Sequence, residues 1–324
     1  MQEVKWKLKE LCFEITNECL LNCIHCSSSS KIGEGYLDKE SILRTINEFE
    51  EMGGEELEIS GGEPLLHPNI WEILDYCKGK NFSTILYTSG IGRALPSELA
   101  NKINVDKAAV SLQGARKITE EVTGKDCYEQ TKTFIKNLVE NGIETEVHFV
   151  PMKQNYHDFE NLLKECESVG VKNIKILRLI PQGRALENWE KIHIPERELK
   201  DFLRKIYEID TSIKIEIGNP LKPYKNEKMS CKAALSSCLI NSKGDVYPCP
   251  ALKTNPLLSA GNIHEKSLTD LWAKGFEDIR KFREDVKHFD CLASWVKTNY
   301  SSYNIYKSSN NKNEEIYKEI FEQI

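Results

Sequence analysis

The strongest constraint on the fold is an alternation of short apolar runs with longer amphipathic stretches between residues 11 and 180. Runs such as LCFEIT, ELEIS and FSTILYTS have the pattern of strands, whereas stretches such as DKESILRTINEFEEMGG have a helical period. Strands that alternate with helices of this length form a parallel sheet with crossover helices. The pattern therefore predicts an α/β fold, a partial (β/α)6 barrel of the TIM-like kind.

The chain of 324 residues changes character after about Asn219. Pro220 and Pro223 mark a break, and LINSKGDVYPC then reads as a hairpin with its turn at Lys243-Gly244-Asp245. SLTDLWAKGFEDIRKF, residues 267–282, reads as one amphipathic helix. We therefore expect three parts: a barrel over residues 1–218, a small hairpin-and-helix region over 219–295, and a linker with a helix over 296–324.

The composition excludes several classes of protein. A net charge of −6 disfavours a general nucleic-acid binder. No apolar run approaches the roughly 18 residues of a transmembrane helix, and the N-terminal stretch has no signal-peptide core. We expect a cytoplasmic protein, in which thiols stay reduced. The eleven cysteines then indicate metal or redox chemistry rather than disulfides.

Polar and glycine-rich turns follow most of the predicted strands. Because ligands bind at the carboxyl ends of the strands in such folds, these turns should lie on one rim. They are Cys19–Cys26, Ser60–Pro64, Thr88–Gly90, Ser111–Gly114 and Pro181–Ala185.

Three thiols, Cys19, Cys23 and Cys26, stand within eight residues. An iron–sulfur cube has four corners that thiolates usually bind, so three cysteines would leave one iron open to a ligand. The alternative is a structural zinc site completed by His25 or a distant residue. The SGGEP turn offers backbone groups beside the carboxylate of Glu63, which suits a small zwitterion with an amino group.

The CxxxCxxC loop after the first strand, with SGGEP after the second, resembles the radical S-adenosylmethionine superfamily over residues 11–185. The resemblance implies that Cys19, Cys23 and Cys26 hold a 4Fe–4S cluster whose open iron binds S-adenosylmethionine. Reductive cleavage would give a 5′-deoxyadenosyl radical that abstracts a hydrogen atom. The residues implied to contact the cofactor are His25 beside the adenine, Ser60, Gly61, Gly62 and Glu63 at the methionine amino group, and Ser89 and Ser111.

The chain departs from the peptide-modifying branch of this family at three places. Ser89 stands where that branch often has asparagine, Gln113 stands where it often has an acid, and an arginine is missing near Thr123-Gly124. These departures concern contacts to the substrate and leave the cleavage chemistry intact.

A second set of cysteines resembles the SPASM or twitch extension, since Cys231 is followed by Gly244 and Cys249 at the spacing of that motif. With Cys238 and Cys291 the set could hold one auxiliary 4Fe–4S cluster. The same four thiolates could instead hold zinc. In a third interpretation, Cys231 or Cys238 is a free thiol that returns a hydrogen atom to a substrate radical.

The remaining cysteines and histidines have a simpler interpretation. We expect core packing for Cys12, structural roles for Cys77, Cys127 and Cys166, and a polar lining or core position for His148. His67 precedes a proline in a turn and should make local hydrogen bonds.

These observations predict a radical S-adenosylmethionine enzyme acting on a ribosomally made precursor peptide, by crosslinking or epimerisation. A small-molecule dehydrogenase or haem-type biosynthetic enzyme is the alternative, and a non-catalytic metal-binding scaffold is a third class. An electron donor such as flavodoxin or ferredoxin would be needed. The first strand begins at about residue 11, which leaves no room for a leader-binding domain and suggests a separate leader-binding protein.

Overall fold

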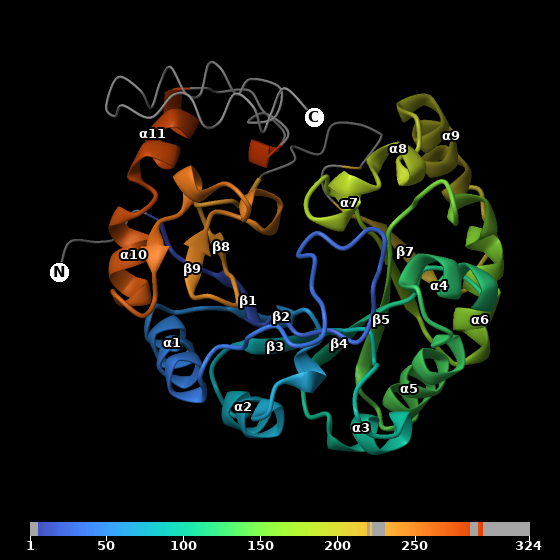
Figure 1. Ribbon diagram of the computed structural model, residues 1–324, viewed down its shortest axis with the longest axis horizontal. Coiled ribbons are helices and arrows are strands. Elements are labelled where there is room, and N and C mark those ends of the chain that lie inside the picture. The colour runs from blue at the N-terminus through green and yellow to red at the C-terminus, as the bar shows by residue number, and fades with distance from the viewer. Residues whose placement is uncertain (1–5, 219–220, 222–230, 286–290, 294–324) are drawn as a thin grey trace.

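The computed structural model describes residues 6–218, 221, 231–285 and 291–293, so the helix expected within 296–324 lies outside the described residues. The described strands form one sheet in the order β10-β9-β8-β1-β2-β3-β4-β5-β6-β7 (Figure 1). Their bounds are β1 (Glu10–Thr16), β2 (Glu56–Gly61), β3 (Ser83–Thr88), β4 (Lys107–Ser111), β5 (Glu144–Phe149), β6 (Asn173–Ile176), β7 (Lys214–Ile217), β8 (Ser237–Ile240), β9 (Asp245–Tyr247) and β10 (Gly261–Asn262).

Helices follow the parallel strands along the chain, and α1, α2, α3, α5 and α6 lie on the outside of the sheet (Figure 1). The helices are α1 (Lys39–Glu51), α2 (Ile70–Cys77), α3 (Pro96–Lys102), α4 (Arg116–Thr123), α5 (Tyr128–Glu140), α6 (Phe159–Ser168), α7 (Arg184–Glu187), α8 (Trp189–Ile192) and α9 (Glu196–Ile206), followed by α10 (Leu268–Lys274) and α11 (Glu277–Asp285). The chain also has short 3₁₀ turns at Pro64–Leu66, Tyr156–Asp158, Pro250–Leu252 and Pro256–Leu258.

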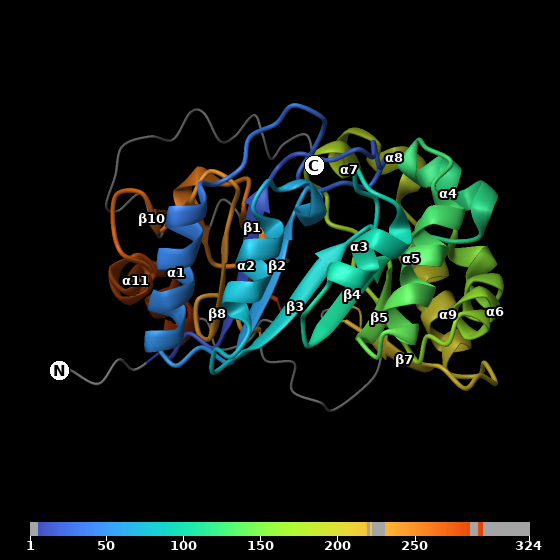
Figure 2. The same cartoon turned by 90° about the horizontal axis from the view of Figure 1, so that it is seen from below.

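Strands β1 to β7 pair in parallel, as β2, β3 and β4 show side by side in Figure 2. The predicted α/β fold is confirmed. The sheet is open, because among the described residues the edge strands β10 and β7 each pair on one side only. Strand β8 adds to β1 in parallel, and the hairpin β8–β9 then reverses direction. The C-terminal region thus extends the same sheet, and the division at residue 218 stays a prediction.

The two faces of the sheet differ in chemistry. On β1, Leu11, Phe13 and Ile15 are fully buried against the outer helices. Cys12 and Glu14 alternate with them and therefore point to the inner face, where they line a cavity. The hydrophobic core lies between sheet and helices, and the inner face is left for polar side chains.

Several elements differ from the sequence prediction. Strand β7 and helices α4, α7, α8 and α9 were not predicted, and the sixth strand ends at Ile176 instead of continuing to Ile180. The helix expected over 267–282 is two helices that break at Gly275. A Cβ at Gly275 would lie 2.3 Å from the Cβ of Ala260, so the close approach of that segment requires glycine there.

Within the residues that the structure describes, no helix is both long and apolar enough to cross a membrane.

The contact between Trp6 and Trp272 ties the start of the chain to its C-terminal helices. Trp272 is 1% exposed, its Nε1–H donates to the carbonyl of Trp6 at 2.8 Å, and the guanidinium of Arg280 lies 4.4 Å from its ring centroid. Replacing Trp272 by alanine should reduce the free energy of unfolding by about 3–5 kcal/mol. Chemical denaturation followed by circular dichroism measures this.

Trp71→Ala is the matched control, because Trp71 is only partly buried. Its loss should be clearly smaller. Equal losses for the two variants would contradict this account of the packing.

Candidate functional site

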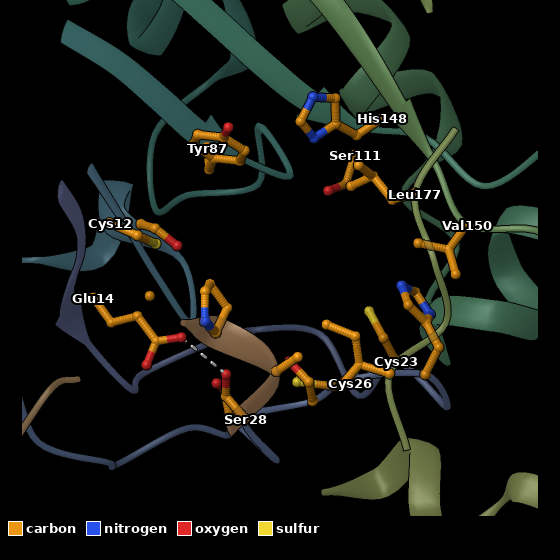
Figure 3. Close-up of a pocket in the computed structure, with 18 of the residues that line it drawn as sticks. Cys12, Glu14, Cys23, Cys26, Ser28, Tyr87, Ser111, His148, Val150 and Leu177 are labelled. Carbon is orange, nitrogen blue, oxygen red and sulfur yellow. Dashed lines mark hydrogen bonds between the residues drawn. The ribbon is translucent and has the colours of Figure 1, made fainter. Parts of the chain in front are cut away.

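The inner face of the sheet encloses a cavity of about 680 Å³ (Figure 3). It is lined by residues of β1 to β5, by the segment after β6, and by the C-terminal region around β8 and β9. Each of the five turns that were predicted to lie on one rim contributes at least one residue to the lining of this cavity.

All three cysteines of the Cys19–Cys26 loop line the cavity. Helix α4 holds the loop from outside. The backbone N–H of Asn22 donates to the carbonyl of Thr123 at 3.0 Å, and that of Ile24 donates to Val122 at 2.9 Å. The loop is therefore fixed by the end of a helix that the sequence analysis did not predict.

Arg184 fastens the same loop from the other side. Its Nε donates to the carbonyl of Cys23 at 2.9 Å, and its Nη1 donates to the carbonyl of Ser30 at 2.9 Å. Gly183 has φ +54°, and a Cβ there would lie 2.8 Å from the carbonyl oxygen of Cys26. The Pro181–Ala185 turn was predicted to reach the rim, but the part of Arg184 in holding the loop was not.

The electrostatics of the loop suit a metal cluster. Burial raises the pKa of Cys19 to about 11 and that of Cys23 further still, while Arg184 lowers both. Binding as thiolates therefore needs positive charge at the site. Among the described residues, no three His, Cys, Asp or Glu side chains are gathered closely enough for a single metal ion.

A tetrahedral zinc ion would hold its thiolates about 3.8 Å apart, given bonds of roughly 2.3 Å. In a 4Fe–4S cube each thiolate binds its own iron and stands farther from the others. Cys19, Cys23 and Cys26 all line the cavity, and the cube stays the predicted centre for this set.

The SGGEP turn packs against the start of the cysteine loop. The N–H of Gly62 donates to the carbonyl of Thr16, and the N–H of Glu63 donates to that of Glu18, both at 2.8 Å. A Cβ on Gly62 would lie 2.4 Å from the Glu18 carbonyl oxygen, so glycine is required. These N–H groups are used by the fold, and the carbonyl oxygens of the turn are the groups suited to an ammonium.

Glu63 is buried and does not line the cavity. Its carboxylate accepts hydrogen bonds from Thr88 Oγ1 at 2.6 Å, from the Ser89 N–H at 2.7 Å and from Ser89 Oγ at 2.5 Å. This side chain joins the turn after β2 to the turn after β3. Glu63 connects these two turns from a buried position outside the cavity lining, whereas the resemblance implies a position at the methionine amino group.

His25 lines the cavity, and its Nδ1 is buried with no hydrogen-bond partner among the described residues. Burial, and secondarily Arg184, lowers the pKa of His25 to about 4, so the ring is neutral at pH 7. A neutral ring with a free polar atom is suited to contact an aromatic base. The other residues predicted to contact the cofactor that line the cavity are Ser60, Gly61, Gly62, Ser89 and Ser111.

The contacts of Gln113 account for the amide at a position where the peptide-modifying branch often has an acid. Its Oε1 accepts from the Val150 N–H at 2.9 Å, and its Nε2 donates to the His148 carbonyl at 3.3 Å. An amide both donates and accepts, which a carboxylate could not do here. Gln113 thus fastens the end of β4 to the end of β5.

The second cysteine set also reaches the cavity. Cys231, Cys249 and Cys291 line it, and Cys249 interacts electrostatically with the other two. Burial raises the pKa of Cys249 to about 12. Arg283 Nη1 lies 3.3 Å from Cys231 Sγ, and Arg178 Nη1 lies 3.8 Å from Cys291 Sγ. The surroundings of these sulfurs are positively charged.

Cys238 does not join these three. It stands opposite Leu11 in the β8–β1 register, so its side chain lies on the outer face with the core. It is 2% exposed, does not line the cavity, and has Arg280 as its charged neighbour.

Two cysteines expected to be structural line the cavity, namely Cys12 on β1 and Cys127 at the start of α5. Cys77 and Cys166 are buried in the outer core, as predicted.

The two histidines also lie as predicted. His148 lines the cavity, and its Nε2 is 2.8 Å from Glu146 Oε1. His67 makes the predicted local contacts: its ring bonds the Leu37 carbonyl at 2.9 Å and accepts from the Asn69 N–H at 3.1 Å.

A buried ion pair lies between the two cysteine sets. Lys253, four residues after Cys249, pairs with Glu14 and donates to Ser28 Oγ at 2.6 Å. Ser28 in turn donates to Glu14 at 3.4 Å, as the dashed line in Figure 3 shows. One charged contact thus connects β1, the first cysteine loop and the C-terminal region.

The comparisons with known proteins agree with this geometry. Residues 13–166 match the radical SAM superfamily, and residues 231–293 match the SPASM iron–sulfur cluster-binding domain. The chain is 26% identical to the AdoMet-dependent haem synthase of Methanosarcina barkeri over 85% of this chain and 84% of that protein. It is 28% identical to the mycofactocin maturase MftC of Mycolicibacterium smegmatis over 87% and 74%, respectively.

Among solved structures, SuiB of Streptococcus suis superposes with a TM-score of 0.71 at 21% identity, over 86% of this chain and 69% of that one. The family implies a 4Fe–4S cluster with S-adenosylmethionine at the first cysteine set and auxiliary iron–sulfur chemistry at the second. The chain belongs to the radical SAM superfamily of enzymes, in the branch that carries a C-terminal SPASM iron–sulfur region.

Proposed function

We propose that this enzyme modifies a ribosomally made precursor peptide, by hydrogen abstraction followed by a thioether or carbon crosslink or by epimerisation. The observation that carries the proposal is the single cavity that runs from Cys19, Cys23 and Cys26 to Cys231, Cys249 and Cys291. Both cysteine sets therefore face the same space, which a substrate can enter. Relatives named as a mycofactocin maturase and a PqqA peptide cyclase support a peptide substrate.

Each part of the first site has a proposed task. When bound, the cluster and S-adenosylmethionine supply a 5′-deoxyadenosyl radical. Cys19, Cys23 and Cys26 hold the cluster, and the carbonyl oxygens of the Ser60–Gly62 turn accept from the methionine ammonium. The neutral ring of His25 contacts the adenine. Ser89 and Ser111, which line the cavity, contact the rest of the cofactor.

For the auxiliary site we propose Cys231, Cys249 and Cys291 as the ligands. Cys238 would have to leave the outer core and turn through the sheet to join them. Crosslinking removes electrons from the substrate, and an acceptor beside the substrate residue would take them up. The positive side chains around these three sulfurs suit a thiolate-bound, negatively charged centre.

The proposal includes partners and a setting. A one-electron donor of the flavodoxin or ferredoxin class reduces the first site, and a separate protein binds the leader of the peptide. We place the enzyme in a reducing cytoplasm, where cysteines stay available as thiolates for iron–sulfur clusters. We keep the division into a barrel over 1–218, an auxiliary region over 219–295 and a tail as part of this proposal.

A haem-type biosynthetic reaction is the second candidate. The observation in its favour is the similarity to AdoMet-dependent haem synthases, which matches that to the maturases in extent.

A peptide assay separates the two candidates. Anaerobically reconstituted enzyme, reductant and S-adenosylmethionine are incubated with short peptides encoded beside its gene, and separately with porphyrin precursors. The peptide should lose a pair of hydrogen atoms, or exchange one for solvent deuterium, as mass spectrometry detects. Oxidation of the porphyrin precursor with no change in any peptide would overturn the proposal in favour of the second candidate.

The ligand assignment predicts the iron content of single variants. The parent and Cys238→Ser should each bind about eight irons per chain, that is two cubes, and Cys249→Ser should bind about four. Iron and acid-labile sulfide quantitation on reconstituted protein measures this. A loss of about four irons in Cys238→Ser, with circular dichroism unchanged from the parent, would contradict the three-cysteine assignment.

A further inference from the structure

The cavity contains a thiol that neither cysteine set uses. Cys12 lies on β1 between Leu11 and Phe13, which are fully buried on the outer face. Its own side chain points the other way and lines the cavity, on the same sheet wall as Tyr87 and His148 (Figure 3). A thiol with only a packing role would be expected on the outer face with its neighbours.

Cys12 belongs to a row of polar side chains on adjacent strands. Cys12 stands opposite Glu58 on β2 in the strand register, so both side chains lie on the same face, and Tyr87 Oη on β3 donates to Glu58 Oε1 at 2.8 Å. The ring of Tyr87 packs edge-on against His148 at 5.2 Å. All four residues line the cavity, so the row forms one wall of it.

The surroundings of Cys12 keep it as a neutral S–H group. Burial, together with the neighbouring Glu58 and Glu14 carboxylates, raises the pKa of this thiol well above its usual range, while Lys253 acts in the opposite sense. Burial also raises the pKa of Glu58, so this carboxyl takes up a proton more readily than an exposed one. A neutral thiol beside a carboxyl group holds both a hydrogen atom and a nearby source of protons.

The position of Cys12 relates it to the first cysteine loop. Lys253, which interacts with Cys12, bonds Ser28, two residues after Cys26. Cys127 is the other unassigned thiol in the cavity, but it interacts with Cys23 itself and lies on the same side as the loop. Figure 3 shows Cys12 and Cys23 on opposite sides of the cavity.

We propose that Cys12 is a catalytic hydrogen-atom donor that quenches carbon-centred radicals formed in this cavity. The S–H bond breaks, a C–H bond forms on the radical, and a thiyl radical remains on Cys12. One electron from the external one-electron reductant and one proton, delivered through Glu58, restore the thiol. The step rests on the family's radical chemistry and holds for a peptide or a small-molecule substrate.

The experiment uses S-adenosylmethionine as the only probe. Reconstituted enzyme is reduced with dithionite in D₂O without substrate, so that the Cys12 thiol becomes S–D. Mass spectrometry then measures deuterium in the 5′-deoxyadenosine. In the parent, the product should carry one solvent deuterium. In Cys12→Ser the deuterated fraction should fall by about tenfold or more, because an O–H bond is too strong to give up a hydrogen atom readily.

Two variants make the result specific. Cys77→Ser removes a thiol buried in the outer core, and Cys127→Ser removes the other unassigned thiol in the cavity; both should retain the parent's deuterium content. Iron content and circular dichroism equal to the parent would show that Cys12→Ser is folded and loaded. Glu58→Gln should retain deuterium in the first turnover and lose it in later ones.

Equal labelling in the parent and Cys12→Ser, or loss of label in Cys127→Ser instead, would overturn the proposal. Absence of 5′-deoxyadenosine from every variant would overturn it too, because no radical would form. Failure of the peptide assay alongside Cys12-dependent labelling would remove the peptide proposal and leave this one standing.

Discussion

The clamp of Arg184 on the first cysteine loop is the interaction on which the rest of the site depends. Eight residues with three cysteines have no regular structure of their own, and a cluster needs its ligands held at defined places. Arg184 bonds the carbonyls of Cys23 and Ser30 from one side, and the end of α4 bonds the loop from the other. The loop is thereby fixed by two elements more than 90 residues distant in the sequence.

Side chains along each strand point alternately to the two faces of the sheet, so the hydrophobic core and the candidate site lie on opposite faces. Outward side chains such as Leu11 and Ile59 form the core, and inward ones such as Glu14 and Tyr87 line the cavity. Because β8 pairs directly with β1, the second cysteine set is built onto the same inner face. The buried Lys253–Glu14 pair then holds the two sets in a fixed relation.

The fold class, the first cysteine set and the rim turns could be predicted from the sequence, because they depend on local periodicity and spacing. Cys238 could not be placed, since its face is decided by the register of β8 against β1. Glu63 could not either, because its partners come from the turn after the next strand. Cys12 is different: its alternation with Leu11 and Phe13 already indicated the inner face, but a thiol was treated as an apolar residue.

The elements that the sequence did not predict have few local signals, or depend on contacts between distant segments. Helix α4 is short and has no side-chain cap at its start, so it has few sequence signals. Gly275 interrupts the last amphipathic pattern for a reason visible only in three dimensions, the close approach of Ala260. Arg184 follows a glycine with φ +54°, a hint of a tight turn but not of what the guanidinium binds.

The account rests on one claim, that three thiolates hold a cluster whose remaining iron binds S-adenosylmethionine. Electron–nuclear double resonance of the reduced Cys249→Ser enzyme, with S-adenosylmethionine labelled with ¹⁵N in its amino group, tests this most directly, because the second centre is then removed. The account predicts a hyperfine coupling between the labelled nitrogen and the cluster. A cluster signal unchanged by S-adenosylmethionine, with no nitrogen coupling, would contradict it.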